Sequence, residues 1–334
     1  MKQYTYILCF LLNVMPVVVH AQSDFDLSQR FFNEAIYNPA ATGNTFTTGF
    51  YLQLRKQWAG LDGAPTTEVF SVDTYLERFL SGIGFSITGD QIGFTNTYTA
   101  RAAYSFFIPI SDKAILSLGA SAGLINRNKN ANGALVDDLN DGELYFGNVS
   151  EFSPDFDFGF EFHGFMKLGA SIRHLGRQSS RNTFPDNSKN IWAYVSTRFN
   201  IIHDLSFEPT ASYMRRNGIN RYEVGGIFYF KKSSVPRFYN DRFWLGGMYR
   251  FNDQYSILAG FHITPKLRIG YSFDYGMREL SIISKGGTHE IFIAWQFNRI
   301  FYKDRQMECP AYRNTEYDTK EKKDRLEKLY YQFY

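Results

Sequence analysis

Cysteine and long apolar runs are both scarce in this chain. Only two cysteines occur among its 334 residues. Cys9 lies close to the start, and Cys309 then has no partner in the same chain, which excludes a disulfide framework. No apolar run after residue 21 approaches the roughly 20 residues that a membrane-spanning helix needs. A helical membrane protein is therefore excluded.

The first 21 residues differ in character from the rest of the chain. Lys2 gives a positive start, residues 7–19 are largely apolar, and small residues surround Ala21. This pattern is typical of a secretory signal peptide. We expect residues 1–21 to be removed by cleavage after Ala21.

Signatures of catalysis are missing. The six histidines are scattered, and no glycine-flanked serine, metal-binding histidine pair or phosphate loop occurs. The sequence thus predicts that the protein is no enzyme and has no cofactor. Residues 137–143 form an acidic run that suits either a solvated loop or a calcium site, although their spacing does not fit an EF-hand loop.

Aromatic residues, by contrast, are abundant. The chain has 33 Phe, 23 Tyr and 4 Trp, yet its mean hydropathy is only −0.31. Membrane β-barrels combine these two properties, because their strands alternate apolar residues toward lipid with polar residues toward the lumen and carry aromatic girdles.

The expected alternation recurs along the chain. Phe156, Phe158 and Phe160 alternate with acidic residues and glycine, a pattern with one apolar face. Counting such segments predicts fourteen strands, at 46–57, 66–76, 80–89, 94–107, 113–125, 155–162, 165–174, 191–200, 204–214, 221–230, 242–251, 255–263, 266–275 and 288–297.

These strands define the predicted organisation. The fold class is an all-β, 14-stranded antiparallel transmembrane β-barrel (46–297), preceded by a signal peptide (1–21) and a short periplasmic or lumenal segment (22–45), and followed by a periplasmic tail (298–334). An even strand count places both termini in the periplasm and the long connections, such as 126–154, outside the cell. The predicted location is the bacterial outer membrane, in contact with its lipid.

Charged residues of both signs fall on the predicted lumenal faces. They suit either a structural lattice of mutual pairs or the lining of a transport path. The set comprises Arg55, Glu68, Arg101, Asp157, Glu161, Lys167, Arg173, Arg198, Glu208, Arg221, Glu223, Arg250, Arg268, Asp274 and Glu290.

The tail is not needed to complete the barrel. Residues 318–334 suit a short amphipathic helix, with an apolar stripe at spacings of three and four. This helix is either a solvated extension or a docking element for a periplasmic partner, through Leu326, Leu329, Tyr330 and Phe333. Nucleic acid is excluded as a partner, because the tail's charges nearly balance and the protein is exported.

Two motifs at the start of the barrel point to a family. The residues are Asn38, Pro39, Ala40 and Gly43, followed by Arg55, Gln57, Trp58, Gly60, Asp62, Gly63 and Pro65. With residues 154–159 and 267–275, they resemble the PorP/SprF family of outer-membrane proteins associated with type IX secretion and gliding motility. The resemblance covers roughly residues 31–297.

This resemblance implies a non-enzymatic component of the secretion machine. Such a protein binds the periplasmic secretion ring, the C-terminal sorting domain of a secreted cargo, or both. Alternatively, residues 33–43 fold into the lumen as a hatch, as in FadL-like transport barrels for hydrophobic compounds. Residues 58–65 could also serve only to close the first hairpin, where glycines permit positive φ.

Overall fold

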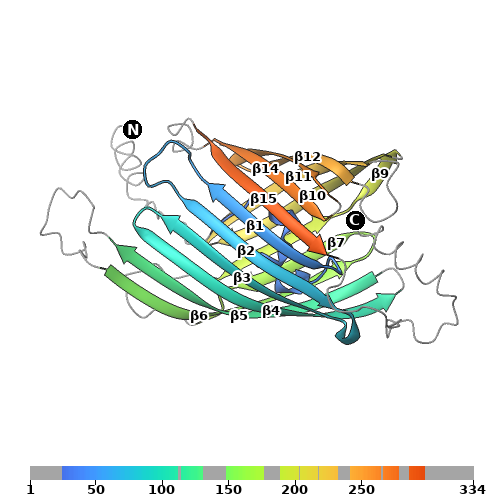
Figure 1. Cartoon of the computed structure of the whole chain (residues 1–334), viewed down its shortest axis with the longest axis horizontal. Coiled ribbons are helices and arrows are strands. Elements are labelled where there is room, and N and C mark those ends of the chain that lie inside the picture. The colour runs from blue at the N-terminus through green and yellow to red at the C-terminus, as the bar shows by residue number, and fades with distance from the viewer. Residues whose placement is uncertain are drawn as a thin grey trace, which may run out of the picture.

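The strands form one closed antiparallel barrel (Figure 1). The structure is a computed structural model that describes residues 25–111, 114–130, 148–176, 189–202, 204–216, 218–231, 241–264, 266–277 and 286–297. The wall begins with β1 (Thr48–Lys56), β2 (Thr66–Leu76), β3 (Ser81–Ile92), β4 (Thr95–Ser111), β5 (Ala114–Asn130), β6 (Asn148–His163) and β7 (Lys167–Arg173). It continues with β8 (Asn190–Ser196), β9 (Phe199–Ile202), β10 (Leu205–Arg216), β11 (Ile219–Lys231), β12 (Asp241–Arg250), β13 (Gln254–His262), β14 (Leu267–Gly276) and β15 (Thr288–Phe297).

The barrel closes where its first strand meets its last. β1 pairs with β15 from Thr48 opposite Phe297 to Lys56 opposite His289. β8 and β9 both pair with β10, at its two ends, and so act as one interrupted strand of the wall. The prediction of a 14-stranded antiparallel barrel is therefore confirmed.

Alternation along the strands separates two environments. On β6, Phe156, Phe158 and Phe160 are exposed on the outer surface, whereas Asp155 and Asp157 are buried inside. This is the arrangement of a membrane barrel, with an apolar band toward lipid and polar groups inward. Among the described residues, no helix has the length and apolar character to cross a membrane.

The predicted wall differs from the structure in two places. Residues 126–154 are not all loop, because β5 continues to Asn130 and β6 begins at Asn148. Glu68 was expected in the lumen, but it is exposed on the outer surface of β2 between the buried Thr67 and Val69. The acidic run at 137–143 lies outside the described residues, as do residues 1–24 and 298–334.

The two ends of the barrel differ in their connections. We call the end with the β1–β2 hairpin (57–65) the loop end, and the end where β1 begins and β15 finishes the turn end. Most connections at the turn end are short, such as residues 164–166, and the long stretch between β5 and β6 lies at the loop end. One pair differs: the connection between β11 and β12 (232–240) is long and lies at the turn end, and that between β12 and β13 (251–253) is short and lies at the loop end.

Residues 25–47, which we call the lumenal segment, cross the inside of the barrel (dark blue in Figure 1). At the loop end, the Phe25 carbonyl accepts a 2.9 Å hydrogen bond from Arg216, the last residue of β10. The segment continues through three short 3₁₀ helices, η1 (Arg30–Phe32), η2 (Glu34–Ile36) and η3 (Pro39–Ala41), to the first residue of β1. Phe25 and Phe297 therefore lie at opposite ends of the barrel.

Candidate functional site

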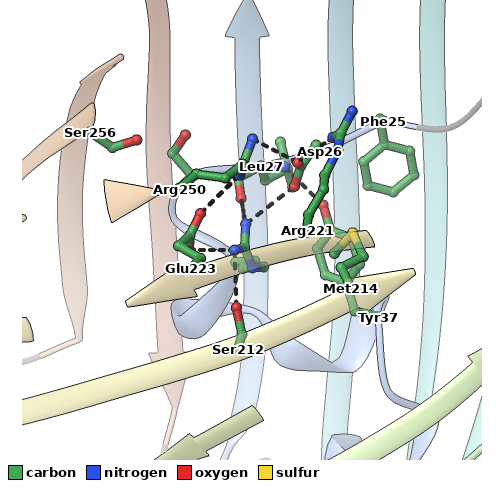
Figure 2. A network of polar contacts seen from close by, with 12 residues as sticks. Phe25, Asp26, Leu27, Tyr37, Ser212, Met214, Arg221, Glu223, Arg250 and Ser256 are labelled. Carbon is green, nitrogen blue, oxygen red and sulfur yellow. Dashed lines mark hydrogen bonds and ion pairs between the residues drawn. The ribbon is translucent and has the colours of Figure 1, made fainter. Parts of the chain in front are cut away.

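Asp26 is the centre of an ion-pair network at the loop end (Figure 2). Its carboxylate lies 2.9 Å from the guanidinium of Arg250, 3.2 Å from that of Arg221 and 3.2 Å from that of Arg30. Arg30 and Arg250 both also pair with Glu223. All five side chains are largely buried. The network thus joins the lumenal segment to β11 and β12.

A second network joins the lumenal segment to the closing strands. The backbone amides of Ser28 and Gln29 donate to Glu290 at 2.7 and 2.9 Å. The Ser28 hydroxyl donates to Asp274 at 2.7 Å. Arg55 pairs with Asp274 at 2.7 Å and with Glu290 at 3.1 Å. Arg55, one of the motif residues, therefore helps to neutralise the carboxylates that hold the segment.

Aromatic side chains fill the space between these polar contacts. Tyr37 packs against Trp192, with ring centroids 5.4 Å apart, and Phe32 packs against Trp244 at 5.2 Å. Both tryptophans point inward and are almost fully buried. The segment's own apolar side chains thus cover the largest inward-facing apolar side chains of the wall.

The Asn-Pro-Ala part of the motif forms the capped helix η3 in the lumen. The Asn38 side chain accepts a 3.0 Å hydrogen bond from the Ala40 amide, which is an N-cap interaction, and Pro39 takes the position after the cap. The Asn38 amide group also donates to the Phe160 carbonyl and the Tyr194 hydroxyl, at 3.0 and 3.1 Å.

Two glycines allow this helix to lie against the wall. A Cβ atom on Gly119 of β5 would collide with the backbone of Pro39 and Ala40. Gly43 has a φ of +72°, which a side chain rarely tolerates, and its amide donates to Asp73 at 2.6 Å. Glycine is needed at both positions for steric reasons.

Near the turn end, the lumenal segment contacts a third polar group. Lys167 pairs with Glu34 at 2.5 Å, and Asn44 donates to Glu161 at 3.1 Å. Glu161 also bonds to His163 and Tyr194. His163, which falls between the predicted strands 155–162 and 165–174, is thus buried at the end of β6 and belongs to a lumenal network.

The second half of the motif lies apart, in the β1–β2 hairpin. Trp58, Gly60 and Gly63 have φ values of +50°, +100° and +71°. The Ala59 amide donates to Gly287 at 2.8 Å, and the Gly93 amide donates to Gly63 at 3.3 Å. The hairpin is therefore tied to the connections on both sides of it, while Asp62 is exposed.

Asp155, Asp157 and His174 are close enough together to share a cation. Arg101, however, lies 2.6 Å from Asp155 and 3.2 Å from Asp157, so an arginine already neutralises both carboxylates. Among the described residues, this cluster is better described as a lumenal ion-pair network than as a metal site.

Several predicted features cannot be placed. Leu326, Leu329, Tyr330 and Phe333 of the tail lie outside the described residues, as does Cys309. The polar contacts of Asp26, Ser28 and Arg30, on the other hand, were not anticipated from the sequence. The only local signal for them is the run of polar residues that precedes the first strand.

Comparisons with known proteins give weak structural likenesses and one clear family. The Ralstonia pickettii toluene transporter TbuX is 14% identical, with 79% of this chain and 92% of that chain covered and a TM-score of 0.49. The Pseudomonas putida toluene transporter TodX is 11% identical, with 83% of this chain and 95% of that chain covered and a TM-score of 0.47. The Acinetobacter baumannii outer membrane protein Omp33 is 11% identical, with 76% of this chain and 98% of that chain covered and a TM-score of 0.43. These likenesses carry no conclusion about function.

The family comparison is different in kind. No curated protein matched the chain. The family described as "Type IX secretion system membrane protein PorP/SprF" matches residues 19–295, which include the whole lumenal segment and nearly all of the barrel. The chain therefore belongs to the PorP/SprF family of type IX secretion membrane proteins.

Proposed function

We propose that this protein is a non-enzymatic outer-membrane component of type IX secretion that binds other proteins at the ends of its barrel. The partners are the sorting domain of a secreted cargo, the periplasmic secretion ring, or both. The observation that carries the proposal is the occupied lumen. Ion pairs bind the lumenal segment at the loop end and near the turn end, so the surfaces offered to large partners are the two ends.

The runner-up function is transport of hydrophobic small molecules. A hatch inside the barrel is what the transport hypothesis expects of residues 33–43, and the lumenal segment does lie inside the barrel. Such transport needs a continuous apolar lining, whereas the inward-facing residues around the segment include buried Arg55, Glu161, Glu223 and Arg250. Moving an apolar solute past paired buried charges is costly, because each charge depends on its partner. Binding at the barrel ends is therefore the better-supported function.

We further propose that the loop end faces outside the cell and the turn end faces the periplasm, since outer-membrane barrels have short periplasmic turns. The tail, which follows Phe297, then starts in the periplasm. An even strand count requires only that residues 47 and 298 lie on the same side of the membrane. The segment before residue 47 can therefore run through the lumen to the opposite side. Phe25 would then lie at the cell surface, unlike the expected periplasmic amino terminus.

Protease accessibility tests this orientation. An epitope with a protease site inserted after Ser23 is expected to be cleaved in intact cells, whereas the same epitope after Tyr334 is expected to be cleaved only after the outer membrane is permeabilised. The reverse pattern would overturn the assignment of the two ends. A third copy at Asp62, in the exposed hairpin of the loop end, serves as the positive control.

Cross-linking in native outer membranes tests the function itself. We expect mild cross-linking, purification of the barrel and mass spectrometry to recover a sorting-domain cargo, periplasmic ring proteins, or both. Recovery of the barrel alone with bound lipid or fatty acid would instead favour transport. Deleting residues 318–334 should reduce recovery of ring proteins if Leu326, Leu329, Tyr330 and Phe333 form the docking stripe; unchanged recovery would exclude that role.

A further inference from the structure

Two cations lie near each other on the outer face of the barrel at the loop end. Arg215, the last but one residue of β10, and Lys189, just before β8, are both exposed. Their neighbours Arg216 and Asn190 are buried inside, so both cations point outward. Arg215 lies directly opposite Ile191 of β8. Lys189, two residues before Ile191, is therefore on the diagonal to Arg215, where residues of paired strands are about 7–8 Å apart.

No carboxylate balances these cations on the described outer face. The outward positions of β8, β10 and β11 hold uncharged residues apart from Arg215. The acids of these strands, Glu208 and Glu223, alternate with the outward residues and point into the lumen. Asp253, in the connection after β12, pairs with Arg250 at 3.5 Å. This part of the outer face therefore carries an excess of positive charge.

Asn220 adds a neutral donor to the two cations. It lies directly opposite Arg215, on β11, and is exposed. The Tyr213 hydroxyl donates to the Asn220 Oδ1 at 2.9 Å, so the amide oxygen is occupied and the NH2 group remains as the donor. A guanidinium fork, an ammonium and an amide NH2 thus lie together without an acceptor. Such a set of donors fits the oxygens of a phosphate group.

Aromatic side chains next to these donors, on the side of the membrane centre, mark the membrane interface. Tyr213 and Tyr222 lie opposite each other with ring centroids 5.3 Å apart, and Tyr222 is 53% exposed. The row continues across β12 and β13 with Tyr249, Phe251 and Tyr255. A girdle of this kind lies at the level of the lipid headgroups. Arg215 and Asn220 are one outward position closer to the loop end, about 5 Å further out on strands tilted by 35–45°.

We propose that Arg215, Lys189 and Asn220 bind a phosphate group of a glycolipid in the outer leaflet of the membrane. The excess of positive charge favours an anionic ligand, and the aromatic girdle beside it favours a ligand whose apolar part lies in the bilayer. A lipid phosphate meets both conditions, whereas a soluble anion would contact only the donors. The leaflet follows from the orientation proposed for the loop end, and the phosphorylated glycolipid of that leaflet is lipopolysaccharide. The inference goes beyond the proposed function, because its ligand is a lipid and not a protein.

Lys56 provides a matched comparison within the same chain. It is also exposed on the outer face at the loop end, as the last residue of β1. Its direct neighbours are Thr66 and His289, and the exposed Glu68 lies on the diagonal of the same face. A single cation beside a carboxylate attracts an anion less than two neighbouring cations do. Lys56 is therefore not expected to bind a lipid phosphate.

Native mass spectrometry of the purified barrel in detergent tests the site, with lipid A as the probe. We expect lipid A to bind the unaltered protein. The double variant Arg215→Ala, Lys189→Ala should bind it about tenfold more weakly, because charge-assisted hydrogen bonds to the phosphate are lost. Dephosphorylated lipid A should bind the unaltered protein about tenfold more weakly for the same reason. Lys56→Ala removes a cation from the same face and should leave the affinity unchanged.

A second variant decides the case if the double variant does not fold, which heat-modified mobility on gels reports. Asn220→Asp is nearly isosteric, and its carboxylate would pair with Arg215 in place of the phosphate, so lipid A should again bind more weakly. Equal affinity for the altered and unaltered barrels, or for lipid A and its dephosphorylated form, overturns the site. Tighter binding of phosphatidylglycerol than of lipid A, or displacement of lipid A by an equal concentration of inorganic phosphate, overturns the glycolipid as the ligand.

The outcomes also separate this site from the proposed function. If the variants bind lipid A as the unaltered barrel does, the lipid site is wrong, and the secretion role and the orientation stand, because neither depends on lipid binding. If the protease experiment places the loop end in the periplasm, the outer-leaflet glycolipid is wrong as the ligand.

Discussion

Asp26→Asn is expected to destabilise the folded barrel by about 3–5 kcal/mol, the usual cost of removing one partner from a buried ion pair. Arg30 and Arg250 would then share Glu223, and Arg250 would keep Asp253 at 3.5 Å as a second carboxylate. Arg221 would lose its 3.2 Å partner without a replacement among these acids. The repulsion between guanidinium groups should loosen the lumenal segment first.

Urea unfolding of the purified barrel in detergent measures this loss. Asp62→Asn makes the same chemical change at an exposed position of the β1–β2 hairpin and should leave the unfolding midpoint unchanged. Protease digestion before unfolding reports whether residues 25–47 have become accessible. A midpoint for Asp26→Asn equal to that of Asp62→Asn would show that the ion pairs do not hold the segment.

Gly119→Leu is expected to displace helix η3 and open the lumen. Even a Cβ atom at this position would collide with the backbone of Pro39 and Ala40, and the rest of a leucine side chain would occupy the space of the helix. Overpacking typically costs about 1–3 kcal/mol, and against backbone atoms we expect about 3 kcal/mol. A cost of this size shifts the equilibrium between bound and displaced η3 toward the displaced state by roughly a hundredfold.

Conductance across planar bilayers measures the opening. The unaltered barrel should be closed to ions, and Gly119→Leu should conduct. Gly247→Leu is the matched control, since Gly247 is exposed on the outer surface of β12 and its nearest non-neighbour atom is 3.8 Å from an added Cβ. Equal conductance in the three proteins would contradict the view that η3 closes the lumen.

The wall could be predicted from the sequence because alternation is a local signal. Fourteen segments with a polar and an apolar face are enough to identify the strands. The alternation from Phe156 to Phe162, for example, is visible in the sequence and lies within β6 of the structure. The signal disappears where a strand leaves the apolar band. Asn126 to Asn130 are polar on both faces, although their backbone remains paired with β6. Alternation therefore predicts a loop where the structure has the long β5–β6 pairing.

The lumenal contacts could not be predicted in the same way. Ser28 and Glu290 are separated by 262 residues, and no periodicity relates them. Strand registers place charges inward, but the partner of each charge depends on the path of residues 25–47 through the lumen. Glu68, the third residue of β2, shows a smaller limit of the method, because the prediction places it on the lumenal face, whereas the structure places it on the outer face.

The path of the lumenal segment sets an order of events for biogenesis. The segment leaves the ribosome before any strand of the wall, yet its outer half binds side chains of β14 and β15, the last strands made. Contacts of such long sequence separation form late and slowly. Residues 25–30 therefore cannot settle until the β1–β15 seam is in place, which makes their burial a marker that the barrel has closed.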